Sequence, residues 1–537
     1  MKFIDLAELE DSISIKVDLC IAGSGPAGTS IAKEFAGSKV QVLVIEGGGE
    51  EESPADEALY DVENVGAMRA TPQRLVRNRV IGGSSHTWSG RCTSFDDIDF
   101  ESRAWIPHSG WPIVPADIHP FLERSREYLA LGPNVYDDQL WKQLGISAPR
   151  PQIDPAFLKS RFWQYSRDKL TFSPTRFART IAEITAPNVR LLMHANITHI
   201  NTSENGTRIK SLDVRTLGGR RAEVKVKAVV LACGGLENAR LLLASYKTMP
   251  KGVGNSHDLV GRFLMDHPGC TLGWFNPHRS TRVQTRFGSY LLDHEDGRNG
   301  YSFGFVLSPE IQRKEQLLNC AAFLHQTPST DDSWNALRRL VIPGAEPHST
   351  RRIEDAIVVV RDLPRLLSNV YRRIARRQMP TLKTEEISLY CLVEQTPDPS
   401  SRVTLSQQTD ALGMPRLRVD WRIGELEQRS VMRLNELIGL ELLRSGLPKP
   451  VYNNHLIDDS NWRSQFIDRA HPSGTTRMSD SPKQGVVDRN CKVHEVAGLY
   501  IAGSSVFPTT SHANPTLMIV AFAIRLADWL KQHEFAD

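Results

Sequence analysis

The residues with the clearest chemical purpose lie near the start of the chain. Gly23, Gly25 and Gly28 form a G-x-G-x-x-G run, and Glu46 follows 18 positions after the last of them. Glycines at this spacing let a backbone approach a pyrophosphate at a helix N-terminus, and an acidic residue about 20 positions on accepts a ribose hydroxyl. The pattern therefore predicts a dinucleotide-binding site.

Two strands and a helix must hold these residues in place. Residues 17–22 form an apolar run with the length of a buried strand, residues 29–36 have helical character, and a second apolar run over 40–45 ends at Glu46. The glycines thus follow a strand and open a helix, which is the context that the fingerprint requires. The fingerprint by itself does not distinguish FAD from NAD.

Two further stretches are rich in small residues. Residues 80–91, VIGGSSHTWSGR, suit a backbone pressed against a flat ligand, although a surface turn is the alternative. Residues 229–243 combine a buried strand, two glycines and a helix. This second strand–glycine–helix unit returns the chain to the nucleotide-binding domain, so we expect that domain to be discontinuous.

The end of the chain carries a third group of motifs. Residues 470–478, AHPSGTTRM, precede residues 498–516, GLYIAGSSVFPTTSHANPT, and an apolar helical pattern follows. Asn514 and Pro515 predict the start of that helix, as an N-cap residue and then proline at the first helical position. The helix N-terminus carries a partial positive charge, which would stabilise the anionic edge of a reduced flavin placed there.

Length and composition bound the remaining function classes. The 537 residues exceed what one simple core holds, so we expect two domains or one elaborated domain. The net charge of +3 gives no reason to expect nucleic acid or a charged membrane surface as a partner. Seven scattered cysteines without C-x-x-C pairs indicate reduced thiols. The N-terminus is unlike a signal peptide and no apolar stretch is long enough to span a bilayer, so the expected location is the cytoplasm.

The pattern of strands predicts a mixed α/β fold with two domains. Strand-like stretches between 189 and 226 form one β-rich block, and five others suggest an antiparallel sheet: 271–275, 300–306, 387–394, 402–406 and 417–421. We expect a discontinuous Rossmann-like domain over 1–110, 186–261 and 462–537, and a substrate-binding domain over 111–185 and 262–461. The second domain contains an Arg-rich helical insert at about 333–377, whose charges favour a solvated helix face over a partner or membrane surface.

Together these motifs resemble the glucose–methanol–choline family of FAD-dependent alcohol oxidoreductases. The resemblance covers nearly the whole chain, through GSGPAG with Glu46, IGGSSHTWSGR, LACGGLENARLLL, HPSGTTRM and GLYIAGSSVFPTTSHANPT. The stretches DDIDFESRAWIPHSGWPI and EQTPDPSSRVTL are similar to the bacterial branch that includes pyranose oxidases and sugar 3-oxidases. The resemblance implies that FAD is the cofactor and that an alcohol carbon gives a hydride to flavin N5.

The resemblance also implies roles for individual residues. The family's catalytic pair is a histidine followed about 43 residues later by a histidine or asparagine, and His471 and Asn514 match it. His471 would be the general base, and Asn514 would hold the substrate oxygen unless it only caps a helix. His512 stands two positions early in the family register, so it is expected near the substrate or in a structural role. Gln395 is expected either to contact the substrate or to be a buried amide satisfied by the sheet.

The cofactor contacts that the resemblance implies are Gly23, Gly25, Gly28, Glu46, Gly82, Gly83, Ser84, Ser85, Trp88, Ile197, Gly503, Ser504, Pro515 and Thr516. The chain departs from flavinylated relatives at His86. In those relatives the histidine that binds the flavin 8α-methyl directly precedes the tryptophan, whereas here Thr87 precedes Trp88. We therefore favour non-covalent FAD.

The sequence thus predicts an FAD-dependent oxidase or dehydrogenase that converts a ring hydroxyl of a sugar or glycoside to a ketone, with oxygen or another acceptor reoxidising the flavin. Two alternatives stay open: a flavin-containing lyase of the same family, resembling hydroxynitrile lyases, and an NAD-dependent dehydrogenase. No histidine pair has metal-ligand spacing, and neither a P-loop nor a nucleophile elbow is present, so a metal site and acyl transfer are unsupported. A homo-oligomer is compatible with the sequence.

Overall fold

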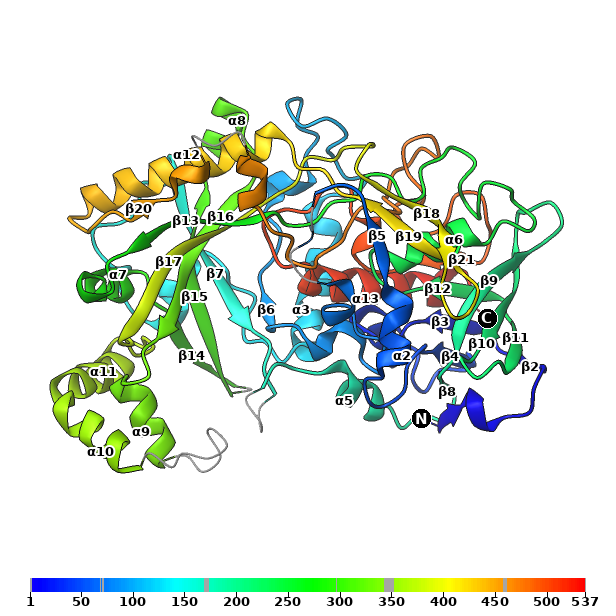
Figure 1. Ribbon diagram of the computed structural model, residues 1–537, viewed down its shortest axis with the longest axis horizontal. Helices are drawn as coiled ribbons and strands as arrows, with labels where there is room; N and C mark the ends of the chain where they lie inside the picture. The colour runs from blue at the N-terminus through cyan, green and yellow to red at the C-terminus, as the bar shows by residue number, and fades with distance from the viewer. Residues whose placement is uncertain are drawn as a thin grey trace.

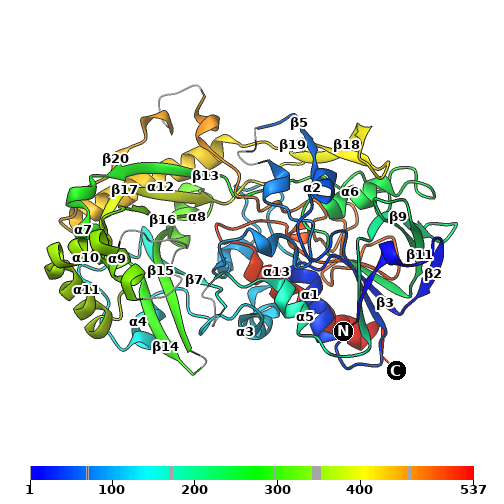
Figure 2. The same ribbon diagram turned by 60° about the horizontal axis from the view of Figure 1, so that its bottom comes forward.

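The computed structural model of the chain has two lobes, each built on a large sheet (Figure 1). The parallel sheet lies in the lobe on the right of Figure 1, and both chain ends belong to this lobe in either view (Figures 1 and 2). The structure describes residues 2–67, 69, 72–168, 173–295, 297–341, 352–456 and 461–536, apart from the side chain of Arg74. No helix in this described part is both long and apolar enough to cross a bilayer.

Six short strands form the parallel sheet, in the order β1 (Lys2–Asp5), β8 (Val189–Met193), β4 (Val42–Ile45), β3 (Leu19–Ala22), β12 (Ala228–Leu231) and β21 (Leu499–Ile501). Every neighbouring pair runs parallel. All residues of β3, β4, β12 and β21 are buried, as in a parallel sheet that is covered on both faces. Three stretches far apart in the sequence therefore meet in one sheet.

The helices around this sheet are α1 (Pro26–Glu34), α2 (Pro54–Glu57), α3 (His119–Tyr128), α5 (Phe177–Ala182), α6 (Glu237–Ala244) and α13 (Thr516–His533). Two of them, α1 and α13, begin at the glycine-rich and C-terminal motifs. Helix α1 begins directly after its N-cap, Gly25, at the carboxyl end of β3. It packs against α13, and the Tyr128 hydroxyl of α3 donates a hydrogen bond of 2.6 Å to Glu34 of α1. The predicted strand–glycine–helix unit is confirmed.

A four-stranded sheet joins this lobe, in the order β2 (Ile13–Lys16), β11 (Arg221–Lys225), β10 (Ile209–Arg215) and β9 (Asn196–Thr202). Strands β10 and β11 lie in the β-rich block that the sequence predicts, and they form a hairpin because they are antiparallel and joined by a short turn. Strand β8 precedes β9 in sequence but belongs to the parallel sheet, where it pairs with β1 and β4. Its placement depends on partners that are distant in the sequence.

The second large sheet is antiparallel and has eight strands. Its order is β20 (Val451–Tyr452), β13 (Gly269–Phe275), β17 (Thr384–Val393), β16 (Cys320–Pro328), β15 (Gly297–Leu307), β7 (Leu158–Tyr165) and β6 (Arg91–Cys92), with β14 (Tyr290–His294) beside β15. Helix α12 (Glu425–Arg444) packs on this sheet, and the short helices α4 (Gln139–Leu144), α7 (Thr281–Arg286) and α8 (Pro309–Glu315) belong to the same lobe. Strand β7 was not among the predicted strands, and its partner β15 lies far along the chain.

Two of the five strands predicted for the antiparallel sheet lie elsewhere. Strands β18 (Arg402–Thr409) and β19 (Pro415–Asp420) form a separate three-stranded sheet with β5 (Val62–Asn64). The pairing of β19 with β5 is parallel and joins residues that lie far apart in the sequence, such as Leu417 and Val62. Local alternation identified the strands correctly, but it carries no information about which sheet they join.

The Arg-rich insert consists of α9 (Ser333–Val341), α10 (Arg352–Arg361) and α11 (Leu363–Ala375), at the end of the molecule farthest from the parallel sheet (Figure 1). Residues 342–351, which include Arg351, lie outside the described residues. The predicted solvated arginine face accounts for only part of the surface of this insert. Ile353, Val360 and Ile374 are 79%, 73% and 72% exposed, whereas Arg372 is buried and donates to Thr285 and Gln378.

Candidate active site

A cavity of about 490 Å³ brings most of the predicted site residues together. It extends past the first glycine loop, the 80–91 loop and the N-terminus of α13, and His471 and Asn514 both line it. Of the residues expected to contact the cofactor, those lining it are Gly23, Gly25, Glu46, Gly83, Ser84, Ser85, Trp88, Ile197, Gly503, Ser504, Pro515 and Thr516. Gly28 and Gly82 lie just behind this lining.

The three glycines of the fingerprint have different packing roles. A Cβ at Gly28 would lie 1.9 Å from the carbonyl oxygen of Gly23, and a Cβ at Gly23 would lie 2.6 Å from that of Ala232. A Cβ at Gly25 would meet no atom within 4 Å, because Gly25 faces the cavity. The first and third glycines therefore permit close backbone packing, and the second leaves room for a ligand.

Glu46 stands at the carboxyl end of β4 and is held by the glycine loop itself. Its carboxylate accepts hydrogen bonds from the Ser24 hydroxyl at 2.6 Å, the Ser24 backbone at 3.1 Å and the Gly48 backbone at 3.1 Å. The same Ser24 hydroxyl accepts a bond from the Gly82 backbone at 3.0 Å, so Gly82 links the 80–91 loop to the fingerprint. The two glycine loops and Glu46 thus form one unit that matches a dinucleotide's pyrophosphate and ribose.

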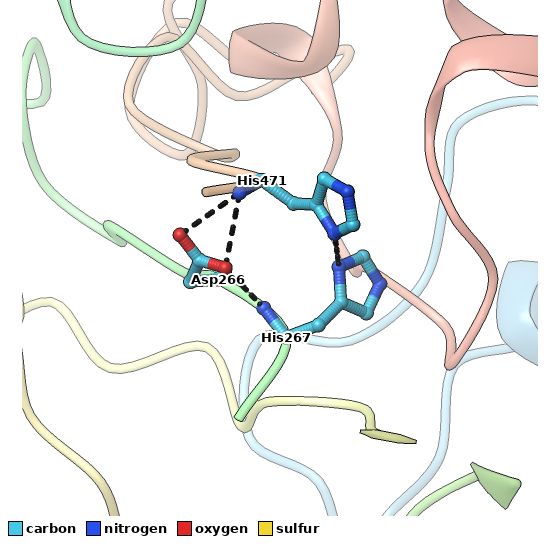
Figure 3. Close-up of side chains that lie close together, drawn as sticks. All are labelled: Asp266, His267 and His471. Carbon is cyan, nitrogen blue, oxygen red and sulfur yellow. Dashed lines mark hydrogen bonds between the residues drawn. The ribbon is translucent and has the colours of Figure 1, made fainter. Parts of the chain in front are cut away.

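The loop that carries His471 is fixed from two sides. Its backbone N–H donates to both carboxylate oxygens of Asp266 at 3.1 Å (Figure 3). Two residues later, Ser473 exchanges backbone hydrogen bonds with Met265 at 2.8 and 3.0 Å. On the other side, the Ser504 hydroxyl donates to the carbonyl of Pro472 at 2.7 Å. Residues before β13 and after β21 therefore set the position of His471.

The imidazole of His471 contacts a second histidine that the sequence analysis missed. The Nδ1 atoms of His471 and His267 are 3.1 Å apart, and Nε2 of His267 is 3.1 Å from the carbonyl oxygen of Thr510 (Figure 3 shows the first contact). A carbonyl oxygen only accepts, so Nε2 of His267 must carry a proton. In neutral His267 the Nδ1 lone pair then accepts from Nδ1–H of His471, and Nε2 of His471 is left unprotonated.

Burial keeps both imidazoles neutral. It lowers the pKa of His471 to about 3, and the nearby His267 adds to the shift while the Asp266 carboxylate opposes it. Burial likewise lowers the pKa of His267, again against the effect of Asp266. His471 therefore presents a free nitrogen lone pair, which is the form that a general base requires.

Asn514 faces the cavity instead of capping a helix. Its Oδ1 atom is buried without a hydrogen-bond partner among the described residues. Helix α13 takes Pro515 as its N-cap, with no side-chain capping bond, so the expected Asn514 cap is wrong. A buried amide oxygen without a partner is costly, which indicates that a ligand or water satisfies it.

Gln395 and His512 are not brought to the cavity. The Gln395 amide accepts from the Asp266 backbone at 2.8 Å and from the Trp421 indole at 2.9 Å, and it donates to the Arg422 carbonyl at 2.6 Å. Three of the four hydrogen bonds that the amide can form thus hold Asp266, Trp421 and Arg422. His512 is fully buried, with Nε2 3.2 Å from Asp96. The geometry therefore supports structural roles for both.

His86, in the 80–91 loop, is directed toward the protein backbone. Nε2 of His86 is 2.9 Å from the carbonyl oxygen of Ile81, and His86 is absent from the cavity lining, whereas Thr87 and Trp88 belong to it. The Trp88 indole donates to the carbonyl of Thr175 at 2.8 Å, which fixes the loop.

Comparison with known proteins identifies the family. The amino-terminal and carboxy-terminal models described as GMC oxidoreductase match residues 178–269 and 397–523. The chain belongs to the GMC oxidoreductase family. It is therefore an oxidoreductase of alcohol groups, in a family of flavoproteins that bind FAD.

Several relatives of this GMC oxidoreductase have curated names. The 2-methyl-1,2-propanediol dehydrogenase of Mycolicibacterium austroafricanum is 22% identical, over 97% of this chain and 96% of the relative. The C-glycoside 3-oxidase of Arthrobacter globiformis is 30% identical over 124 residues, which is 22% of this chain and 21% of the relative. Among solved structures, formate oxidase has a TM-score of 0.57 at 17% identity, covering 98% of this chain and all of that one.

His267 should act as a positioning residue for His471. Replacing His267 with Leu removes the acceptor that holds the proton on His471 Nδ1, so flavin reduction should slow by about tenfold, the worth of one hydrogen bond. His267→Asn places an amide oxygen near the former Nδ1 and should restore most of the rate. Anaerobic stopped-flow absorbance measures both, with bound flavin quantified first. Equal losses in the two variants would show that His267 only fills space.

Proposed function

We propose that this GMC oxidoreductase oxidises an alcohol with FAD, and that its substrate is a sugar or glycoside whose ring hydroxyl becomes a ketone. One observation carries the proposal. A single cavity joins the two glycine loops and Glu46 to an unprotonated histidine nitrogen and to the Asn514 amide oxygen, which has no partner among the described residues. A base and a hydrogen-bonding group beside a cofactor are what removal of a proton and a hydride from a carbinol requires.

The cofactor fits the residues that are present. Gly25 leaves open space at the N-terminus of α1, and Glu46 is fixed at the end of β4 where a ribose hydroxyl would lie. Pro515 and Thr516 bring the N-terminus of the 18-residue helix α13 to the same cavity, and its partial positive charge suits an electron-rich ring edge. When bound, FAD supplies the hydride acceptor. We also propose that residues 1–110, 186–261 and 462–537 form the FAD-binding domain.

The roles of the two polar residues follow from their hydrogen-bonding groups. Nε2 of His471 accepts the hydroxyl proton, and the bond from His471 Nδ1–H to His267 keeps that nitrogen available. The Asn514 amide group donates to the substrate oxygen and accepts through its unpartnered Oδ1. His471 thus removes the proton while Asn514 orients the oxygen.

A sugar substrate is supported by the sequence resemblance to sugar 3-oxidases and by the partial match to a protein named C-glycoside 3-oxidase. An anaerobic screen of monosaccharides, glycosides and simple alcohols, followed by an oxygen pulse, tests both the substrate class and the acceptor. Bleaching of the flavin by a sugar supports the proposal. A lyase of the same family would leave the flavin oxidised, and an NAD-dependent dehydrogenase would contain no flavin.

Acid precipitation should release FAD from the protein, because the His86 ring is bonded to the Ile81 carbonyl and Thr87 takes the cavity-facing position. Absorbance of the supernatant and of the resuspended pellet measures the partition. His86→Ala provides the matched control, since its flavin should behave in the same way. Flavin that stays on the wild-type pellet and leaves the His86→Ala pellet would reveal a covalent link.

His471→Ala should slow flavin reduction by roughly 10²–10⁴-fold, the usual contribution of a general base, while FAD stays bound. Asn514→Ala should cost less of the rate and leave helix α13 intact, because Asn514 makes no capping bond. His512→Ala serves as the comparison and should have the smallest effect, because His512 lies outside the cavity lining. Stopped-flow reduction and thermal unfolding measure these changes. A larger loss at His512 than at His471 would overturn the assignment.

The pH dependence of flavin reduction should lack the usual histidine step. Because burial lowers the pKa of His471 to about 3, the base stays unprotonated from pH 8 down to pH 5, where an ordinary histidine would have lost most of its free base. The apparent second-order rate constant, which reports the free enzyme, should therefore be flat over this range with a neutral substrate. A tenfold or larger decrease in this rate constant, centred near pH 6.5, would contradict the lowered pKa of His471.

A further inference from the structure

One half-buried arginine at the substrate end of the cavity has no anionic partner among the described residues. The Arg91 guanidinium lies 3.5 Å from the ring centre of Phe323 and 4.9 Å from that of Trp163. Its Nε atom is buried without a hydrogen-bond partner, and Arg91 forms no ion pair with any described residue. Burial lowers the pKa of Arg91, which reflects the same cost.

A second arginine lies at the same end of the cavity. Arg469 and Arg91 both belong to the lining, together with Phe323, Leu392 and His471. The Arg469 guanidinium lies 5.2 Å from the ring centre of Tyr390 and donates to the Tyr390 hydroxyl at 3.3 Å. No described carboxylate pairs with it, so two positive charges face the place where a substrate must lie beside His471.

The carboxylates of Asp266, Asp96 and Glu394 are already engaged in ion pairs. Asp266 pairs with Arg69 at 2.7 Å and accepts three backbone N–H groups, from His267, Arg469 and His471. Asp96 pairs with Arg161 at 2.9 Å, and Glu394 forms a buried pair with Arg103. None of these acids is left to neutralise Arg91 or Arg469 within the described part of the chain. Contact with aromatic faces compensates a half-buried guanidinium less completely than an anion does.

We propose that the substrate is an anionic alcohol. Its anionic group, either a carboxylate or a phosphate, binds Arg91 and Arg469, while its hydroxyl contacts His471. The planar guanidinium matches either oxyanion with two parallel hydrogen bonds. Phe323 and Leu392 cover the carbon frame between the two ends. Sugar acids and sugar phosphates are the substrate classes with this chemistry. The proposal rests on the proposed alcohol oxidation.

Binding to the oxidised holoenzyme tests the anion site without turnover. Benzoate, its neutral match benzamide, and inorganic phosphate are titrated while the flavin absorbance and tryptophan fluorescence are followed. Benzoate or phosphate should bind at least tenfold more tightly than benzamide. Raising the ionic strength should weaken the binding of the two anions and leave the binding of benzamide unchanged. Preference for benzoate indicates a carboxylate, and preference for phosphate indicates a phosphoryl group. Equal affinities for benzoate, phosphate and benzamide would overturn the proposal.

Variants assign the effect to the two arginines. Arg91→Gln should weaken anion binding by roughly 10- to 100-fold, and Arg469→Gln by less because Arg469 is more exposed. Arg91→Lys keeps the charge but loses the planar fork, so a drop smaller than that of Arg91→Gln is expected. Arg215→Gln, at an exposed position on β10, is the control and should bind as the wild type does. Unchanged anion affinity in Arg91→Gln, or in Arg469→Gln if the first variant does not fold, would overturn the proposal.

Flavin reduction then separates this proposal from the proposed function. Glucuronate is compared with glucuronamide, and glucose 6-phosphate with glucose, in oxygen-free solution. The anionic member of a pair should reduce the wild-type flavin with at least tenfold higher efficiency, and Arg91→Gln should abolish that advantage. Reduction by neutral members with no anionic preference refutes the anion site and leaves alcohol oxidation intact. Tight anion binding without reduction by any alcohol supports the anion site and refutes alcohol oxidation.

Discussion

The buried carboxylate of Asp266 is the interaction on which the geometry of the site depends. It accepts backbone hydrogen bonds from His267, Arg469 and His471, and a further one from the Arg69 guanidinium. Burial alone would raise the pKa of Asp266, but Arg69 and the two neighbouring histidines lower it, so the carboxylate stays ionised. Removing one partner of such a buried network typically costs several kcal/mol, because the remaining charges are left uncompensated.

Asp266 also joins the two large sheets. It precedes β13 of the antiparallel sheet. The His471 loop is hydrogen-bonded to Ser504, which follows β21 of the parallel sheet. Gly235, in the turn between β12 and α6, adds to this contact: a Cβ there would lie 2.0 Å from the Pro472 carbonyl oxygen. His471, the proposed base, is therefore positioned by residues of both lobes, and a shift of either sheet would move it relative to the glycine loops.

Local patterns in the sequence were sufficient to predict the strand–glycine–helix unit before Glu46 and the type of most elements. The glycine fingerprint, Glu46 and the 80–91 loop are short-range signals, since steric limits on a backbone turn act over a few residues. What the sequence did not reveal was pairing across long distances. Strand β19 joins β5 instead of the antiparallel sheet, and His267 meets His471 over 204 positions.

Two side chains illustrate the same limit at the level of single residues. An asparagine before proline is typical of a helix cap, yet Asn514 makes no capping bond and leaves its oxygen toward the cavity. Gln395 stood in a motif and suggested a substrate contact, yet its amide is used to hold Asp266 and Trp421. A polar side chain in a motif shows which chemistry is available, and only the surrounding fold determines whether it faces ligand or protein. The signal for His267 was present as an Asp-His-Pro sequence before β13, but its spacing to His471 gave no hint of contact.

The charges around His471 resolve an apparent conflict between its low pKa and its proposed role as a base. A base works best when its pKa lies near the working pH, and a pKa of about 3 makes His471 a weak proton acceptor in the free protein. Burial and His267 cause most of the shift, but Arg469 contributes as well. An anionic substrate bound to Arg469 would offset that positive charge, and the pKa of His471 would rise as the substrate arrives. The arginines that hold such a substrate would then also control when the base becomes effective, so that proton transfer is favoured only with the alcohol in place.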